Sequence, residues 1–593
     1  MTFSIKSRAE EIKKLKTRRL DLLVIGGGIT GAGLALQASA AGMRTALIDM
    51  QDFGAGTSSR STRLVHGGIR YLKSFDVEVV SETVQERAII QHVAPHVTRP
   101  DPMLLPIYDE PGTTFSMFSV KIAMDLYDRL AGINKSEYLK KYANYTLDKE
   151  QVLKLEPQLN PENLAGGGVY LDYLNNDSRL VIENIKKAHD LGGLMVSRMK
   201  AVKVLHNQFG NACGVTVKDM ISGEEFDVKA KIVLNASGPW SDFVKDLDDK
   251  HDQRKTQMRP TKGVHLVVDQ SRLNVPKPTY FGSGTNDGRM IFTIPRDGKT
   301  YFGTTDTDFK GDLTHPKVDQ GDVDYLLKII NKKYPNAHIT LDDVESSWAG
   351  VRPLVAEEPA PVDDKKKEEE KPDVVSGASD SGSHKLTASQ VSRGSSLKRA
   401  DDGLITLAGG KLTDYRKMAD GAMKMIIEIM NTQYARDFKP VDSASIKVSG
   451  GDFDSNHAEE ELENYAKEAI AAGVDPVGAE KMANIFGSNT EEVIANAKDT
   501  KPIAGLSLAE TLSLRYSMEN EMTLTPEDYL FRRTNNLLFN HDEIKNVKAG
   551  VISEMAKYYD WTDDQIKDYT EKTNELINEA ELDYLKDAAA VEA

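Results

Sequence analysis

Three glycines near the start of the chain have the spacing of a phosphate-binding turn. Gly26, Gly28 and Gly31 form a G-x-G-x-x-G pattern. In this pattern the first glycine permits a tight turn, and the second lets the backbone approach a pyrophosphate. The third lets the following helix pack closely on the preceding strand, and the N-terminus of that helix attracts phosphate. The pattern therefore predicts a dinucleotide site.

An acid follows this turn at the spacing used for ribose recognition. Asp49 lies 21 residues after the second of these glycines, at the end of another apolar strand. A carboxylate there can accept hydrogen bonds from ribose hydroxyls. The next loop is rich in hydroxyls, and Thr57, Ser58 and Ser59 are placed to bond a pyrophosphate or a ribityl chain.

A second glycine turn bears on which dinucleotide binds. Gly409 and Gly410 precede Lys411 and a helix that begins near Thr413. Their backbone can face the pyrimidine edge of a flavin, where electron density accumulates on reduction. Two such turns, about 380 residues apart, suit a large cofactor such as FAD better than NAD.

The elements that must hold these turns follow an α/β pattern. The apolar segment Leu20–Gly28, a helix to Ala41 and the strand Thr45–Asp49 make a βαβ unit. Such a unit opens a doubly wound sheet with helices on both faces. We expect the same sheet to gain strands from 201–205, 213–217, 231–235 and 404–407.

Later segments predict a second layer and a helical tail. Residues 261–268, 290–294 and 301–303 alternate apolar and polar side chains, which predicts an antiparallel sheet over the cofactor. Residues 357–390 contain a charged run and then Ser/Gly-rich sequence, which predicts a flexible insertion. Beyond about Pro440, apolar residues recur at helical spacing.

These segments predict an α/β fold class with three domains. The chain of 593 residues is too long for one hydrophobic core. The FAD-binding domain is doubly wound and discontinuous, the substrate domain is an antiparallel sheet, and the C-terminal domain is helical. The predicted ranges are 20–100, 165–255 and 345–435 for the FAD-binding domain, 100–165 and 256–345 for the substrate domain, 357–390 for the insertion, and 440–593 for the helical domain.

Composition narrows the classes of partner. The chain has 91 acidic and 75 basic residues and a formal net charge of -16, so nucleic acid is not expected as a partner. The single cysteine, Cys213, permits no intramolecular disulfide and is compatible with a cytoplasmic location. No membrane-spanning run or signal peptide is expected. Residues 4–19 predict a charged, solvated helix, with a peripheral membrane contact as the less favoured alternative.

Several longer motifs resemble one protein family. The chain is similar to FAD-dependent glycerol-3-phosphate dehydrogenases and oxidases over about residues 20–435 and in the helical tail. Within that family, the insertion before Val391 and the segment Glu345–Gly350 resemble the alpha-glycerophosphate oxidases of lactic-acid-type bacteria. The motifs that carry the resemblance are Gly26–Gly31, Gly56–Leu72, Asn235–Trp240, Lys262–His265, Gly303–Thr307, Gly350–Leu354, Val391–Arg393 and Gly409–Thr413.

The resemblance implies an activity in glycerol metabolism. It implies FAD as the cofactor and oxidation of sn-glycerol 3-phosphate to dihydroxyacetone phosphate by a cytoplasmic enzyme. Oxidases of this family pass the electrons to oxygen and yield hydrogen peroxide, whereas dehydrogenase relatives sit on membranes and reduce quinone. The expected partners are therefore glycerol 3-phosphate and oxygen, while a homo-oligomer and a peripheral membrane contact stay open.

A dianionic phosphate needs several converging cations, preferably arginines that bind it in a bidentate manner. The resemblance places Arg352, Arg393 and Lys411 at the family positions for that pocket. Arg70 and Tyr71 are further candidate donors from a matched motif. No metal is expected in the site.

Oxidation of a secondary alcohol also requires a base. The hydroxyl proton must leave while hydride moves from the carbon to flavin N5, and a histidine of near-neutral pKa suits the first task. Of the 12 histidines, His66 and His265 lie inside the matched motifs. We take His66 as the better base candidate and His265 as a contact for the substrate hydroxyl or the flavin, with the choice between them open.

Three alternatives predict different results. A membrane-associated dehydrogenase with the same substrate would need quinone for turnover. An amine or amino-acid oxidase on the same fold would need a pocket for a carboxylate and an amine instead of a cluster of cations. A flavin-bearing protein without activity would keep its flavin oxidised when substrate is added, although His66, Arg352 and Lys411 together argue against it.

Overall fold

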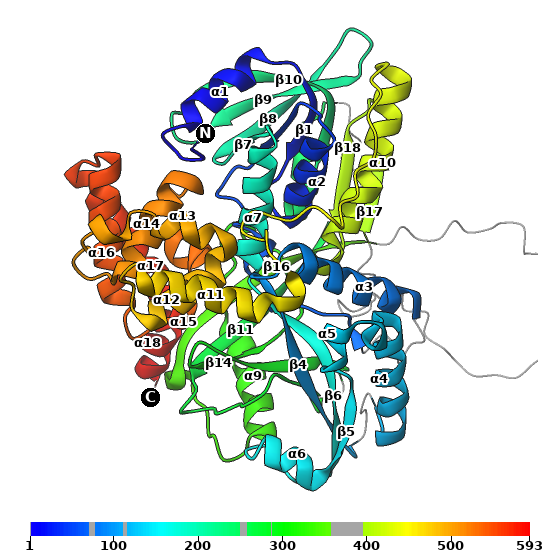
Figure 1. The fold of residues 1–593 in the computed structure, drawn as a ribbon, viewed down its shortest axis with the longest axis vertical. Helices are drawn as coiled ribbons and strands as arrows, with labels where there is room; N and C mark the ends of the chain where they lie inside the picture. Colours follow the sequence, from blue (N-terminus) through cyan, green and yellow to red (C-terminus); the bar gives the residue numbers. More distant parts are fainter. Residues whose placement is uncertain are drawn as a thin grey trace, which may run out of the picture.

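Two sheets and a helical C-terminal region make up the fold (Figure 1). In Figure 1 the first sheet lies in the upper half and the second in the lower half, with the orange and red C-terminal helices at the left. The α/β fold class with a helical C-terminal region, predicted from the sequence, is confirmed. The computed structural model describes residues 2–69, 77–110, 115–249, 258–285, 287–356 and 395–592.

The first sheet has a parallel core. In spatial order its strands are β17 (Ser395–Arg399), β18 (Ile405–Gly409), β10 (Glu225–Asn235), β1 (Leu20–Ile25), β2 (Thr45–Ile48) and β7 (Leu194–Val196), with β8 (Met199–His206) and β9 (Ala212–Asp219) joined to β10. β1 pairs in parallel with β10 and β2, whereas β17 and the β8–β9 ribbon pair in antiparallel. All six residues of β1 are buried, as expected when both faces of a parallel sheet are covered.

Helix α2 (Ile29–Ala40) connects β1 to β2 and completes the predicted βαβ unit. It packs against α7 (Asp177–Asp190) and α10 (Tyr415–Gln433), so three distant parts of the chain lie side by side on this sheet (Figure 1). Gly33 allows α10 to approach, because a Cβ there would lie 2.5 Å from the Tyr415 ring. The helix after the first glycine turn is thus held by the helix after the second.

The second sheet is mainly antiparallel, as predicted. In spatial order its strands are β15 (Thr307–Asp308), β11 (Met258–Asp269), β14 (Lys299–Gly303), β13 (Met290–Arg296), β12 (Thr279–Gly282), β4 (Thr98–Tyr108), β6 (Leu164–Asn175) and β3 (Leu64–Val65), with β16 (Val344–Val355) paired to β11 and β5 (Tyr145–Asp148) to β6. β11 pairs with β16 along its whole length, and this register places His265 opposite Trp348.

Helices pack on both faces of the second sheet, because alternate residues of β4, Met103 and Leu104, belong to two separate hydrophobic cores. α4 packs on both α3 and β6, whereas α9 packs on β11. α3 and α4 also carry side chains, Arg87 and Tyr127, that form a network with the loop before residue 70, as described below. The bounds are α3 (Val77–Val93), α4 (Met117–Ala131), α5 (Glu137–Lys140), α6 (Lys149–Leu155) and α9 (Gln320–Lys333).

The elements described beyond residue 440 are all helical, as predicted. A buried ion pair ties this region to the first sheet, because Asp52 accepts from Arg532 at 2.6 Å and from Arg533 at 2.7 Å. The loop after β2 is therefore anchored by the C-terminal helices. The bounds are α11 (Ala458–Ala471), α12 (Pro476–Phe486), α13 (Thr490–Ile494), α14 (Leu508–Asn520), α15 (Asn536–Phe539), α16 (Ile544–Tyr559), α17 (Asp563–Ala580) and α18 (Asp583–Glu592).

The strands predicted from sequence occur in the expected sheets. The four segments assigned to the first sheet form β8, β9, β10 and β18, and the three antiparallel segments form β11, β13 and β14. The division into domains stays a prediction. β3, β6 and β16 hydrogen-bond within the second sheet although they fall in ranges assigned to the FAD-binding domain. The predicted insertion, 357–390, lies outside the described residues.

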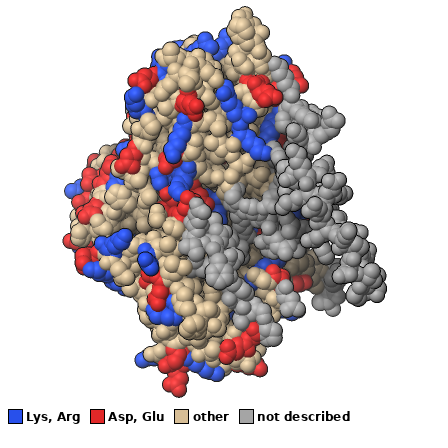
Figure 2. Space-filling model, turned by 90° about the vertical axis from the view of Figure 1, so that its right-hand side faces the viewer, with Lys and Arg blue, Asp and Glu red and all other residues tan. Residues whose placement is uncertain are grey.

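The opening helix is a charged helix with one exposed face, as predicted, but its other face packs on the first sheet, which was not expected. In α1 (Arg8–Thr17), Leu15 is fully buried, and Arg8 forms a buried ion pair with Asp219 at 2.7 Å. None of the described helices has the length and apolar composition needed to cross a membrane. Figure 2 shows acidic and basic side chains interspersed over the described part of one face.

Candidate active site

A cavity of about 620 Å³ lies between the two sheets. Its walls come from the carboxyl ends of β1 and β2, from the turn between β18 and α10, and from β11, β13 and β16 of the second sheet. Ligands of open α/β folds bind at this edge of the parallel strands. A volume of this size is typical of a cofactor or substrate site.

The first glycine turn presents backbone to the cavity. Gly26 has a φ of 111°, and a Cβ there would lie 2.5 Å from the Ala236 carbonyl oxygen. A Cβ at Gly31 would overlap the Gly26 carbonyl, so this glycine provides the close helix–strand packing that the pattern predicts. Gly28 is the N-cap of α2 and lines the cavity. The helix N-terminus is therefore accessible to a phosphate group.

Asp49 follows the last residue of β2 and lines the same cavity. Its carboxylate accepts from the backbone N–H of Gly27 at 2.6 Å and from that of Gln51 at 2.8 Å. Burial raises the pKa of Asp49 to about 6, against the opposing effect of these two hydrogen bonds. The acid thus lies beside the glycine turn, where the sequence predicts a ribose contact.

Two of the three predicted loop hydroxyls reach the cavity. Thr57 and Ser58 line it, with the Thr57 hydroxyl donating to the Val351 carbonyl at 2.5 Å. Ser58 Oγ accepts from the backbone N–H of Ile29 at 3.0 Å, which satisfies one amide at the N-terminus of α2. Ser59 is fully buried, and its hydroxyl donates to a backbone carbonyl within its own turn at 3.3 Å.

The second glycine turn borders the same cavity as these loops. Gly409 and Gly410 have φ angles of 77° and 79°, and a Cβ at Gly410 would overlap the Met418 side chain. Both glycines and Thr413 line the cavity. The Thr413 hydroxyl donates to the carbonyl of His66 at 3.5 Å. This hydrogen bond joins the second turn to the segment that carries the base candidate.

His265 is buried in an aromatic and cationic environment. Its ring stacks on Trp348 with the centroids 4.7 Å apart, and its Nε2 lies 3.1 Å from the Thr62 hydroxyl. Burial, together with the nearby charges of Arg352 and Arg63, lowers the pKa of His265 well below its ordinary value, so the imidazole is neutral at neutral pH. Among the described residues its Nδ1 has no hydrogen-bond partner, which leaves a buried polar atom for a bound group.

His66 reaches the same cavity from the segment after β3. It is half-buried, and its ring lies edge-on to Phe292 with the centroids 5.8 Å apart. Phe292 in turn stacks on Tyr280, with the centroids 4.1 Å apart, and both rings line the cavity. The structure therefore brings the two predicted histidines together, with an apolar wall beside His66.

Arg352 on β16 is held in place by its neighbours. Its Nη1 lies 3.0 Å from the Asp306 carboxylate, and its Nη2 donates to the Thr304 hydroxyl at 3.0 Å. A Cβ at Gly263 would lie 2.5 Å from the guanidinium, so this glycine makes room for Arg352 beside β11. Lys411 lines the same cavity. Two of the predicted phosphate-binding cations are thus brought together.

These features fit a flavin dinucleotide. Two glycine turns border one cavity, and the first also presents a helix N-terminus to it. Asp49 supplies an acceptor beside that turn, and His265 Nδ1 is a buried polar atom that still lacks a partner among the described residues. The residues that would surround such a cofactor are Gly26, Gly28, Asp49, Thr57, Ser58, Gly409, Gly410 and Thr413.

Comparison with known proteins assigns the family. Residues 21–392 match the family model described as FAD dependent oxidoreductase, and residues 441–566 match that of the C-terminal domain of alpha-glycerophosphate oxidase. The alpha-glycerophosphate oxidase of Enterococcus casseliflavus is 53% identical to this chain, with 99% of each chain covered. The chain belongs to the alpha-glycerophosphate oxidase family. The predicted enzyme class, an FAD-dependent oxidoreductase, is therefore confirmed.

Further members and solved structures agree with this family. The alpha-glycerophosphate oxidase of Streptococcus pneumoniae serotype 4 is 50% identical over 99% of this chain and 100% of its own. The glycerol-3-phosphate dehydrogenase of Bacillus halodurans, complexed with FAD, has a TM-score of 0.78 and 34% identity over 98% of each chain. The L-alpha-glycerophosphate oxidase of Mycoplasma pneumoniae, with FAD bound, shares the fold at a TM-score of 0.51 and 17% identity, over 69% of this chain and 95% of that one.

Sequence reasoning did not single out Arg289, which is one of several further cations that line the cavity of this alpha-glycerophosphate oxidase family member. Arg289 precedes β13 and lines the cavity, and its Nη2 donates to the carbonyl of Asp306 at 2.5 Å. Asp306 also binds Arg352, so both guanidiniums contact the same residue. The available signal was a basic residue at the start of a strand predicted to cover the cofactor. The predicted site residues outside the described part of the chain are Arg70, Tyr71 and Arg393.

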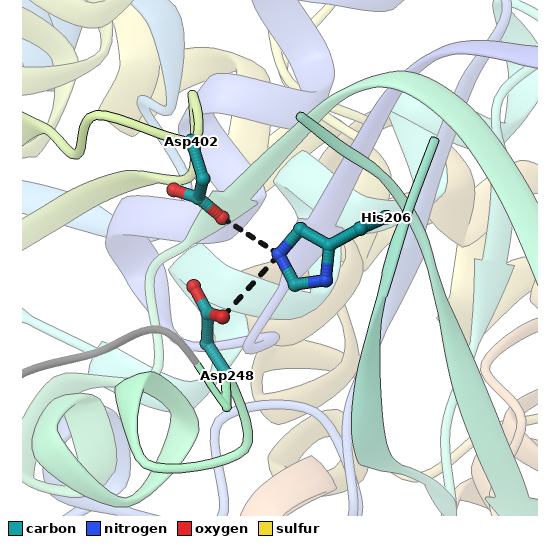
Figure 3. Close-up of side chains that lie close together, drawn as sticks. All are labelled: His206, Asp248 and Asp402. Atoms are coloured by element: carbon teal, nitrogen blue, oxygen red, sulfur yellow. Dashed lines mark hydrogen bonds and ion pairs between the residues drawn. The ribbon is translucent and has the colours of Figure 1, made fainter. Parts of the chain in front are cut away.

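A histidine and two acids cluster elsewhere in this family member (Figure 3). His206 Nε2 lies 3.0 Å from Asp402 and 3.3 Å from Asp248, and both carboxylates are buried. The three side chains come from the end of β8, the segment after α8 (Ser241–Lys245) and the turn before β18. Because the imidazole itself bridges the two carboxylates, we interpret the cluster as an ion pair that joins these three segments.

Proposed function

We propose that this chain oxidises sn-glycerol 3-phosphate to dihydroxyacetone phosphate, with FAD as cofactor and oxygen as electron acceptor, and so produces hydrogen peroxide. The observation that carries the proposal is the convergence in one cavity of the Gly26–Gly31 turn, His66, His265, Arg352 and Lys411. The relatives named alpha-glycerophosphate oxidase, 50 and 53% identical over 99% of the chain, support the same reaction.

Arg352 and Lys411 bind the substrate phosphate in this proposal. Because Asp306 and Thr304 already fix the two terminal nitrogens of Arg352, the guanidinium loses little side-chain freedom when the phosphate arrives. A dianion beside two or more cations is bound by charge-assisted hydrogen bonds. From the sequence we propose that Arg70, Tyr71 and Arg393 complete this pocket.

His66 acts as the general base in this proposal. Its imidazole is half-buried at the cavity wall, whereas burial lowers the pKa of His265 well below its ordinary value. A base needs a pKa near the working pH to accept a proton efficiently, so the lowered pKa of His265 argues against His265 as the base and leaves His66 as the candidate. The neutral His265, with Nε2 beside Thr62, would orient the substrate hydroxyl or the cofactor through its other nitrogen.

FAD supplies the oxidising chemistry when it is bound, because its ring system accepts hydride from an alcohol carbon and passes electrons to oxygen. The helix N-terminus at Gly28 would hold its pyrophosphate, and Asp49 would accept from its ribose hydroxyls. The backbone of Gly409 and Gly410 would border the pyrimidine edge. Ser58 would donate a further hydrogen bond, whereas Thr57 and Thr413, whose hydroxyls already donate to backbone carbonyls, would accept.

Peroxide stoichiometry tests the proposed electron acceptor. With oxygen as acceptor, one equivalent of hydrogen peroxide forms for each glycerol 3-phosphate consumed, and no added acceptor is needed. The rival is a membrane-associated dehydrogenase that reduces quinone. The identity to relatives named oxidase exceeds the 34% identity to the dehydrogenase of known structure, which disfavours this rival. Slow turnover that a quinone analogue restores would contradict the oxidase assignment.

Other sequence predictions accompany the proposal. A cytoplasmic location stays a prediction, as do a homo-oligomer and a peripheral contact with membrane. Light scattering of the purified holoenzyme measures whether it forms a homo-oligomer. Flotation with lipid vesicles measures whether it binds membrane. Neither result alters the proposed reaction, because all site residues named above belong to one chain.

A further inference from the structure

The peptide bond that follows His66 is held by a buried polar network. The N–H of Gly67 lies 2.9 Å from the Tyr127 hydroxyl and 3.1 Å from the Asp172 carboxylate. A Cβ at Gly67 would overlap the Tyr127 hydroxyl and lie 2.5 Å from the side chain of Val84. The chain can therefore approach these acceptors only because residue 67 is glycine.

A third side chain completes the network. Arg87 Nη1 donates to the Asp172 carboxylate at 2.5 Å and to the Tyr127 hydroxyl at 2.9 Å. The Tyr127 hydroxyl in turn donates to Asp172 at 2.7 Å. All three side chains are buried. Burial raises the pKa of Asp172, and its three donors oppose that rise. The negative charge of Asp172 is thus balanced by the positive charge of Arg87 and by hydrogen bonds inside the core.

Both polar groups of the His66–Gly67 peptide bond have partners. The N–H is bound by Tyr127 and Asp172, while the carbonyl accepts from Thr413 in the second glycine turn. The donors and acceptors come from α4, β6 and the turn before α10, and the supporting arginine comes from α3. Four elements that are distant in sequence therefore fix one peptide plane, and His66 extends from that plane into the cavity.

We propose that Tyr127 and Asp172, balanced by Arg87, are positioning residues for His66. They fix the His66–Gly67 peptide and so the direction in which the imidazole leaves the main chain. The inference rests on the proposed function, in which His66 takes the substrate hydroxyl proton. A base must lie within hydrogen-bond reach of that proton, and a misplacement of about 1 Å can slow a reaction about a hundredfold.

Tyr170 offers a matched control. It is fully buried, and its ring lies edge-on to that of Tyr127 with the centroids 5.5 Å apart. Its hydroxyl donates to the sulfur of Met103 at 3.5 Å, whereas the Gly67 N–H donates to Tyr127 and Asp172. Tyr127→Phe and Tyr170→Phe therefore remove the same atom from two neighbouring positions of one core.

The experiment follows flavin reduction by glycerol 3-phosphate in the holoenzyme, without air, by stopped-flow absorbance. We expect Tyr127→Phe to slow reduction about tenfold and to shift its pH profile, with FAD content and substrate Kd within about twofold of the parent. Tyr170→Phe should stay within about twofold of the parent in every measurement. Equal reduction rates in the two variants would overturn the proposal.

His66→Asn separates this proposal from the proposed function. If His66 is the base, His66→Asn slows reduction strongly, and Tyr127→Phe in that background adds little, because Tyr127 acts through His66. A double variant with the full loss of both single variants would overturn the positioning role. A His66→Asn enzyme with the parental rate would instead contradict the base assignment in the proposed function.

A second substitution tests the proposal if Tyr127→Phe does not fold properly. If Tyr127→Phe binds less FAD or has a lower Tm than Tyr170→Phe, Asp172→Asn replaces it, because loss of the charge weakens the acceptor of the Gly67 N–H and leaves Arg87 without its counter-ion. About tenfold slower reduction with an unchanged substrate Kd would support the proposal. A folded, FAD-loaded Asp172→Asn enzyme that reduces its flavin at the parental rate would overturn it.

Discussion

The two ends of the cavity are built in different ways. At the end where we propose that the cofactor binds (the cofactor end), Gly26, Gly28 and Gly410 bring backbone close to a neighbour, and their spacing within each turn is local in sequence. At the end where we propose that the substrate binds (the substrate end), Arg352 and His265 come from different strands of the second sheet, and each is oriented by partners from elsewhere. We therefore expect a substitution that fills space at the cofactor end to abolish flavin binding. Substitutions at the substrate end should instead lower kcat/KM by graded amounts.

Gly28→Val should have the largest effect. A β-branched side chain at the N-cap of α2 would begin 3.1 Å from Ser58 Oγ and occupy the path proposed for the pyrophosphate. We expect the variant to purify without flavin, as measured by visible absorbance. Gly421→Val is the matched control, because a Cβ at that helical position meets open space, and it should purify yellow. A yellow Gly28→Val protein would mean that the cofactor lies elsewhere.

Arg352→Ala should weaken the substrate end without loss of flavin. Removal of a charge-assisted, bidentate contact should cost roughly 2–4 kcal/mol of transition-state binding, or a fall in kcat/KM of about 30- to 1000-fold. Arg272→Ala serves as control, because Arg272 forms an exposed pair with Asp343 at 2.6 Å. An unchanged kcat/KM for glycerol 3-phosphate in Arg352→Ala would contradict the proposed phosphate pocket.

Arg289→Ala should have a smaller effect at the same end. Arg289 lines the cavity and donates to the Asp306 carbonyl, so its loss removes one charge and loosens the segment that holds Arg352. We expect KM for glycerol 3-phosphate to rise roughly fivefold with kcat little changed. Arg289→Lys keeps the charge and should recover most of the loss. If the lysine variant is as poor as the alanine variant, charge is not what Arg289 contributes.

Asp49→Asn should have the smallest effect, which is a change in how the stability of the apoprotein depends on pH. Its pKa rises from 3.8 to about 6 on folding, so the folded protein binds more protons than the unfolded chain between these values. The stability that Asp49 contributes is therefore greatest at the acid end of this window and is lost as pH rises through about 6. The Tm of the apoprotein minus that of Asp49→Asn should fall across this window. A difference that grows with pH would contradict the raised pKa.

The local geometry of the first glycine turn could be predicted from the sequence because its determinants are local. Gly26, Gly31 and Asp49 lie within one βαβ unit, and spacing alone specifies a turn, a helix contact and a strand end. The helical tail was also predictable from apolar periodicity. The packing of Leu15 in the opening helix was not, because a short charged segment gives no sign of the surface that covers it.

The substrate end depends on strand register and on long-range partners. The neutral state of His265 follows from its position opposite Trp348 and from two nearby arginines, which no local pattern specifies. Arg289 reaches the cavity because it directly precedes β13, which the sheet places next to β14. The acceptors of the Gly67 N–H lie 60 and 105 residues away in sequence, so the sequence alone does not identify them.

The most direct test of the account is anaerobic reduction of the purified enzyme. Glycerol 3-phosphate is added to the protein without air, glycerol is added to a second sample at the same concentration, and the visible flavin absorbance is followed. We predict that glycerol 3-phosphate bleaches the flavin rapidly and that glycerol leaves it oxidised. A colourless purified protein that takes up no FAD, or equal bleaching by both alcohols, would contradict a cavity with flavin at one end and a phosphate pocket at the other.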